Sequence, residues 1–173
     1  MTEDVENIET EQADENSIPK NRVQFLSFTL GDEEYGVDIL CVQEIRSWEP
    51  VSRIPNVPSY EKGVVNLRGA IVPIVDLRDR FGLGHLAYTP LTVVVVLQTK
   101  TESDQSRVMG VVVDSVSDVI DVDKKTIQDA PNFGTKVSTE FINGLASVKE
   151  RMVMLLDVNK LLRLESLGIE DEN

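Results

Sequence analysis

Two stretches of this chain, GVVNLRGAIVPIVDL (residues 63–77) and GLASVKERMVMLLDV (residues 144–158), align with each other without a gap. Gly63 matches Gly144, Asp76 matches Asp157, and Arg68 at the centre meets Lys149. Each stretch is an apolar run, a short polar interruption and a second apolar run, which is typical of a β-hairpin. A repeat of this kind predicts two copies of one supersecondary unit.

A second pair of segments repeats upstream of the first, in the same order and with spacers of similar length. The matching positions are Gly36, Val37, Val42, Glu44 and Ile45 in one copy and Gly110, Val111, Val116, Asp118 and Val119 in the other. Chance similarity between apolar strands is the alternative, and the shared glycines, acids and order argue against it. We therefore expect two related halves, with repeat segments 36–77 and 110–158.

Short β-branched and aromatic runs fill the rest of residues 21–167. VQFLSFTL (23–30) and YGVDI (35–39) predict a hairpin around the turn residues GDEEYG, and TVVVVLQT (92–99) and RVMGVVVD (107–114) predict two further strands. LCVQEIRSW (40–48) is ambiguous between a helical turn and a strand. From Asp157 to about Leu167 the spacing predicts a short helix, capped by Asp157 and stopped by Gly168. The chain therefore belongs to the all-β class, as two small packed β-barrel subdomains with a C-terminal helix.

The net charge of −13 is concentrated at the ends of the chain. Residues 1–20 are acidic and poor in large apolar side chains, so we expect a disordered acidic tail, and residues 168–173 should fray. The overall sign argues against nucleic acid and against an anionic membrane surface. The apolar run LTVVVVL (91–97) is too short for a membrane helix, which needs about 20 such residues, so no direct membrane insertion is expected. Without a visible signal peptide, the protein is expected to be cytoplasmic.

Catalytic constellations are hard to defend in this sequence. His85 is the single histidine and Cys41 the single cysteine, so neither a catalytic triad, a metal cluster nor a disulfide framework is supported. No phosphate-binding glycine loop is present, and we expect no cofactor. Asp76 and Asp114 each end an apolar strand, as the phosphoacceptor of a receiver domain does, but the chain lacks the alternating strands and helices of that fold. A hydrolase using dispersed carboxylates stays open as a remote alternative.

Arg68 is the residue that the hairpin pattern does not explain. A two-residue turn uses glycine for positive φ, which accounts for Gly69, but it does not require an arginine beside it. The NLRG turn occurs only in the first copy of the repeat. Arg68 is either a solvated turn residue or a side chain presented to a partner, and a binding module is the class of function that remains.

The motifs FTLGDEEYGVDILCVQEIR, GVVNLRGAIVPIVDLR and GVVVDSVSDV resemble the CheW family of chemotaxis coupling proteins, over about residues 23–164. The resemblance implies two five-stranded barrels like Src-homology-3 domains, and an adaptor without enzymatic activity. The implied partners are the regulatory domain of the histidine kinase CheA and the cytoplasmic tips of methyl-accepting chemoreceptors, in membrane-bound arrays. An adaptor of the same fold for a different array, such as one for surface motility, is the alternative.

The resemblance also implies a set of protein-binding positions, without assigning each to the receptor or the kinase. They are Val42, Glu44, Ile45, Gly63, Asn66, Arg68, Val93, Gly110, Val116 and Val119. Core packing is the competing explanation for the valines. Arg68 and Glu44 are the stronger candidates, because a charge at a turn or strand end has no role in a core.

Overall fold

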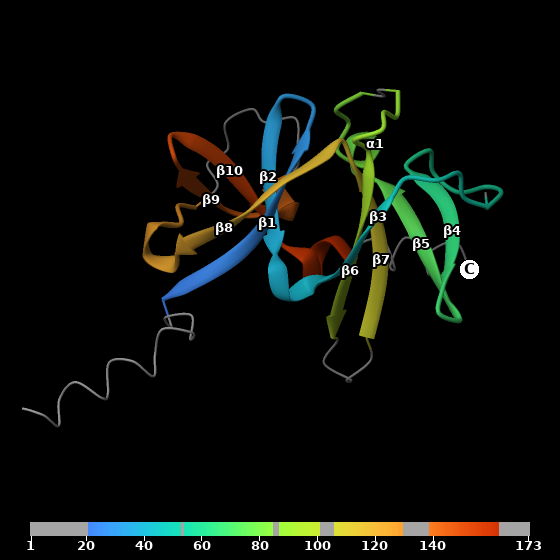
Figure 1. Cartoon of the computed structure of the whole chain (residues 1–173), viewed down its shortest axis with the longest axis horizontal. Coiled ribbons are helices and arrows are strands. Elements are labelled where there is room, and N and C mark those ends of the chain that lie inside the picture. The colour runs from blue at the N-terminus through green and yellow to red at the C-terminus, as the bar shows by residue number, and fades with distance from the viewer. Residues whose placement is uncertain (1–20, 53, 85–86, 101–105, 130–138, 163–173) are drawn as a thin grey trace, which may run out of the picture.

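The computed structural model describes residues 21–52, 54–84, 87–100, 106–129 and 139–162, which form two five-stranded sheets (Figure 1). The first sheet has the order β8-β1-β2-β10-β9 and contains β1 (Arg22–Leu30), β2 (Glu33–Asp38), β8 (Ser115–Asp123), β9 (Ile142–Val148) and β10 (Arg151–Leu156). The second has the order β3-β6-β7-β5-β4 and contains β3 (Val42–Ser47), β4 (Glu61–Leu67), β5 (Ala70–Asp76), β6 (Val93–Lys100) and β7 (Ser106–Val113). The short helices are α1 (Leu77–Arg80), η1 (Ile39–Cys41), η2 (Lys124–Thr126), η3 (Thr139–Phe141) and residues 158–162.

The two sheets have the same internal architecture. Each contains one parallel pair, in which Gly36 of β2 faces Leu155 of β10 and Gly110 of β7 faces Ile74 of β5. Each also has a register shift at the same place in its repeat hairpin, beside Gly63 in β4 and beside Gly144 in β9. This is the arrangement expected of two copies of one unit, and the predicted all-β fold with two subdomains is confirmed.

The two sheets exchange one strand each, so that each contains a strand from the chain segment that forms most of the other sheet. β3 follows β2 in the chain but pairs with β6 in the second sheet, and β8 follows β7 but pairs with β1 in the first. In Figure 1 both strands cross between the two halves of the molecule. The subdomains are therefore intertwined, and the two crossovers, at residues 38–42 and 113–115, are where the sheets meet.

Three apolar clusters explain why the central strands are continuously hydrophobic. In β6, Val95 and Leu97 belong to a cluster shared by both sheets, whereas Val94 and Val96 belong to a cluster within the second sheet. A third cluster, which includes Phe25 and Ile120, lies within the first sheet. Since both faces of these strands are covered, the strands need no polar face, and the alternation of a half-exposed strand is lost.

The hairpin turns correct one expectation from the sequence. Arg68 and Gly69 have φ values of 53° and 88°, and Lys149 and Glu150 have values of 49° and 65°. Both residues of each turn have the positive φ of the left-handed region, so the second copy adopts the same geometry without glycine. The prediction that this turn requires glycine was wrong, because the strand pairing on either side imposes the turn at a local cost in strain.

The structure tests three further predictions from the sequence. The ambiguous segment 40–48 combines both possibilities, since it ends the turn η1 and then forms β3. β2 begins at Glu33, so the first turn is shorter than GDEEYG. Asp157 caps the last helix, as predicted, by accepting a hydrogen bond from the Lys160 N–H at 3.0 Å. Residues 1–20, 85–86 and 163–173, which include both predicted ends, His85 and the last residues of the predicted helix, lie outside the described residues.

Candidate functional site

Glu44, Asn66 and Arg68 come together at the β4–β5 turn, and we call these three residues the turn surface. The Arg68 guanidinium lies 3.4 Å from the carboxylate of Glu44, which belongs to β3, while Arg68 belongs to the turn between β4 and β5. Asn66 fixes the turn, because its Oδ1 accepts a hydrogen bond from the Gly69 N–H at 2.9 Å. The Arg68 side chain is 80% exposed, so the pair with Glu44 orients the guanidinium while leaving it open to a partner.

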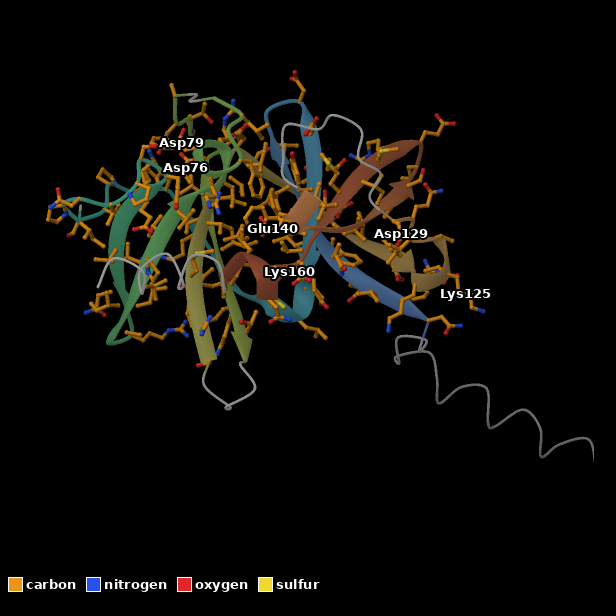
Figure 2. The ribbon with its side chains drawn as sticks, turned by 180° about the vertical axis from the view of Figure 1, so that it is seen from behind. Asp76, Asp79, Lys125, Asp129, Glu140 and Lys160 are labelled. Atoms are coloured by element: carbon orange, nitrogen blue, oxygen red, sulfur yellow. The ribbon has the colours of Figure 1, made fainter. Side chains whose placement is uncertain are left out.

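A pocket of about 440 Å³, which we call the inter-sheet pocket, lies beside the β2–β3 crossover. It is lined by Leu40, Cys41, Val42, Gln43, Gln98, Thr99 and Asn159. Asn159 belongs to the helix that follows β10 of the first sheet, while Gln98 and Thr99 belong to β6 of the second. Figure 2 shows Lys160 on that helix, between the two sheets. Among the described residues the lining carries no charged side chain, and Leu40 is 90% exposed, so the pocket suits an apolar side chain of a protein partner.

Cys41 lines this pocket, but its thiol is poorly suited to chemistry. Burial, and then the carboxylates of Asp38 and Asp157, raise the pKa of the Cys41 thiol. A raised pKa keeps the thiol protonated, and the thiolate is the nucleophilic form. Cys41 therefore acts as a small apolar residue of the lining.

The predicted positions on β3 and β8 occupy equivalent places in the two sheets. Val42 and Val116 are half-buried and pack against the shared cluster, so for both the core-packing explanation holds in part. Ile45 and Val119 are both 46% exposed. Each sheet thus presents one exposed aliphatic side chain on its exchanged strand, which a protein partner can cover.

Gly63 and Gly110 are buried, and Val93 is only partly exposed. Val93 is half-buried against the shared cluster at the start of β6. Gly63 is buried where a Cβ would stand 2.0 Å from the Ser52 carbonyl oxygen, and a Cβ at Gly110 would stand 2.5 Å from Ile74 Cδ1. Both glycines allow a close approach inside the second sheet, so any effect of theirs on binding acts through packing.

Several exposed apolar residues were not predicted from the sequence as binding positions. Leu40, Ile71, Leu91 and Met152 are all more than half exposed. One signal was present, because the repeat alignment places Ile71 opposite Met152, and two equivalent apolar residues beside two turns could have been singled out. Leu40 and the other pocket residues come from three distant segments, so no local pattern brings them together.

The described ranges contain neither a metal-binding cluster nor a membrane-spanning helix. No three histidine, cysteine, aspartate or glutamate residues there come together as ligands for a metal ion. No helix in the same ranges is long and apolar enough to cross a membrane. The Asp157 carboxylate caps the last helix, and the Glu44 carboxylate forms an ion pair with Arg68.

Comparison with known proteins gives a consistent result. Residues 24–166 match the model of the CheW-like domain. The chemotaxis protein CheW of Klebsiella aerogenes is 49% identical over 148 residues, covering 86% of each chain, and the protein FrzA of Myxococcus xanthus is 30% identical over 142 residues, covering 81% of this chain and 85% of FrzA. The crystal structure of the scaffolding protein TtCheW from Thermoanaerobacter tengcongensis aligns with a TM-score of 0.72 at 29% identity, over 83% of this chain and 88% of that one. This chain belongs to the family of CheW-like domains.

Proposed function

We propose that this protein is a chemotaxis adaptor that joins methyl-accepting chemoreceptors to a CheA-type histidine kinase and performs no chemistry itself. Support comes from its family and from the relative of 49% identity that is a chemotaxis protein CheW. The observation that carries the proposal is the turn surface, where a largely exposed arginine is oriented by Glu44 and serves no need of the fold. In this role the protein works in the cytoplasm, beside the receptor tips.

The inter-sheet pocket is the surface we assign to the receptor. Receptor tips of this class are helical, and a helix docks by placing apolar side chains into an apolar groove. Leu40 and Val42 supply apolar contact, and the amides of Gln43, Gln98 and Asn159 offer donors and acceptors at the rim. The kinase regulatory domain is assigned to the second sheet, at the end that carries Ile45 and the turn surface.

An adaptor of this kind acts by biasing which arrangement of the kinase is populated. It can do so only if its contacts differ in free energy between the two arrangements. Interfaces of transient signalling complexes are modest in area and depend on a few anchor residues, among which arginine is over-represented. Arg68 is the anchor we propose for the turn surface.

The test is a calorimetric titration of the full chain with the kinase regulatory domain from the same cell. We expect saturable one-to-one binding, and at least tenfold weaker binding by Arg68→Ala, since losing an anchor costs about 1.4 kcal/mol or more. Lys149→Ala is the matched control, because Lys149 occupies the equivalent position in the second hairpin and should bind as the unmodified chain does.

Two results would contradict the proposal in different ways. If neither the unmodified chain nor its variants bind the kinase domain at high concentration, the link to that kinase is wrong, and an adaptor of the same fold for a different array, such as one for surface motility, becomes the better candidate. If binding is intact but Arg68→Ala and Lys149→Ala behave alike, the adaptor role stands and the turn surface is not the kinase contact.

A further inference from the structure

One carboxylate ties the two sheets together at the β7–β8 crossover. Asp114 Oδ2 accepts a hydrogen bond from Arg78 Nη1 at 2.6 Å and another from the Gly31 N–H at 2.7 Å. Gly31 lies in the β1–β2 turn of the first sheet, and Arg78 lies in α1, which follows β5 of the second. The Asp114 N–H also donates to the Thr29 carbonyl at 3.1 Å. We call Gly31, Arg78 and Asp114 the clamp.

The clamp is partly buried and held at both ends. The Arg78 side chain is 10% exposed and that of Asp114 is 30% exposed. Arg78 Nε donates to the Gly84 carbonyl at 3.4 Å, and the Arg78 N–H donates to Asp76 Oδ1 at 3.0 Å. Charge-assisted hydrogen bonds of this kind are directional and are roughly twice as strong as neutral ones.

Aromatic contacts around α1 strengthen the connection. Phe81, directly after α1, lies 6.0 Å from Tyr35 of the first sheet and 5.6 Å from Phe141 of η3, between ring centroids. The Arg80 guanidinium lies 5.0 Å from the ring centroid of Tyr60 and 4.9 Å from that of Phe141. α1 therefore touches both halves of the molecule, near Asp76 and Asp79 in Figure 2.

The β2–β3 crossover is equivalent to the β7–β8 crossover in the repeat, but it carries different side chains. By the repeat alignment, Leu40 stands where the second half has Asp114, and Asn159 stands where the first half has Arg78. Leu40 and Asn159 both line the inter-sheet pocket, and Leu40 is 90% exposed. The molecule is thus clamped by charge at one crossover and open at the other.

We propose that Arg78 and Asp114 are positioning residues, a pivot that holds the two sheets together at the β7–β8 crossover, so that motion between the sheets occurs at the opposite crossover, beside the inter-sheet pocket. The apolar cluster shared by the sheets is non-directional, so it resists separation more than rotation. A directional contact at one crossover lets the opposite crossover open or close around it. This inference deepens the proposed function, because the pocket is the surface assigned to the receptor.

The test measures the distance between the sheets in the full chain, without any partner. Spin labels are attached to Ile71→Cys in β5 and Met152→Cys in β10, in a Cys41→Ser background. These are equivalent exposed positions, one in each sheet. We expect a narrow distance distribution that becomes broader or displaced when Asp114→Asn is added, because the charge on the clamp is lost.

Asp121→Asn is the matched control. It breaks the Arg22–Asp121 pair, 2.9 Å long and exposed, between β1 and β8 of a single sheet, and it should leave the distribution unchanged. An unchanged distribution in a cooperatively folded Asp114→Asn variant would overturn the pivot. If that variant is unfolded at the temperature of measurement, Arg78→Lys takes its place, and an unchanged distribution there has the same meaning. Because no receptor or kinase is added, failure here is distinct from failure of the adaptor function.

Discussion

The two repeat hairpins share a backbone and differ in what their turns present. In β4–β5 the turn is Arg68–Gly69, and the arginine reaches Glu44 on β3; in β9–β10 it is Lys149–Glu150, and the neighbouring Arg151 lies 3.4 Å from Glu34 of β2. Since both hairpins have left-handed turns and the same register, the fold requires neither the arginine nor the glycine. The duplication therefore separates the scaffold, which both copies share, from side chains that one copy alone presents.

Glycine at the register shift is part of the scaffold, but the two copies do not depend on it equally. A Cβ at Gly63 would stand 2.0 Å from the Ser52 carbonyl oxygen, and φ there is 147°. At Gly144 a Cβ would stand 2.6 Å from Ile127 Cγ2 and 2.9 Å from the Gln128 carbonyl oxygen. A backbone carbonyl cannot move aside as a side chain can, and the carbonyl at Gly63 is the closer of the two, so the first copy should tolerate a side chain less well.

The largest effect we predict is from Gly63→Ala. It should lower the free energy of unfolding by about 4 kcal/mol, because strain and a backbone clash coincide. Gly144→Ala should lower it by about 2 kcal/mol, as an overpacked site does. Urea unfolding followed by circular dichroism measures both. Equal losses would mean that the close approach to Ser52 does not distinguish the two copies.

Much of the fold could be predicted from the sequence, because the repeat and the strand periodicity are local signals. The gapless match of residues 63–77 with 144–158 identifies both hairpins, and Asp157 is recognisable as a helix cap. The exchange of β3 and β8 between the sheets could not be predicted, because strand partnership depends on contacts far apart in the chain. The same holds for the parallel pairs β2–β10 and β5–β7.

The site was only partly within reach of the sequence. Arg68 and Glu44 could be chosen because a charge at a turn or strand end has no role in a core, and the structure places the two side chains 3.4 Å apart. Gly63 and Gly110 were chosen with them but are buried, since a glycine motif does not reveal whether it serves a surface or a close approach. The inter-sheet pocket is assembled from η1, β3, β6 and the last helix, so its members carry no shared motif.

Transplanting the clamp to the open crossover would sharpen the comparison between the two halves. The double variant Leu40→Asp with Asn159→Arg places an aspartate and an arginine in the inter-sheet pocket, at the positions equivalent to Asp114 and Arg78 of the clamp. We expect the affinity for a receptor cytoplasmic fragment to fall at least tenfold, about 1.4 kcal/mol, while the melting temperature is kept or raised. Titration calorimetry and thermal unfolding measure the two quantities.

The control for this transplant is the single variant Asn159→Arg, which adds the cation without its carboxylate partner or the loss of Leu40. Its effect on receptor affinity should be smaller than that of the double variant. Undiminished affinity in the folded double variant would show that the receptor does not enter the inter-sheet pocket.

The smallest effect concerns the turn of the second hairpin. Glu150 holds φ at 65°, a conformation that costs an L-residue about 1 kcal/mol or more, while glycine adopts it freely. Part of that gain is offset by the greater freedom of glycine in the unfolded chain, so Glu150→Gly should raise the free energy of unfolding by about 0.5 kcal/mol.

The reciprocal change, Gly69→Ala in the first hairpin, should lower the free energy of unfolding by a similar amount, since a Cβ there meets no atom within 4 Å and backbone strain is the main cost. Chemical denaturation of both variants against the unmodified chain measures the pair. If Glu150→Gly is destabilising instead, the side chain of Glu150 contributes more to the second hairpin than the strain it imposes, and the two turns are less alike than their backbones.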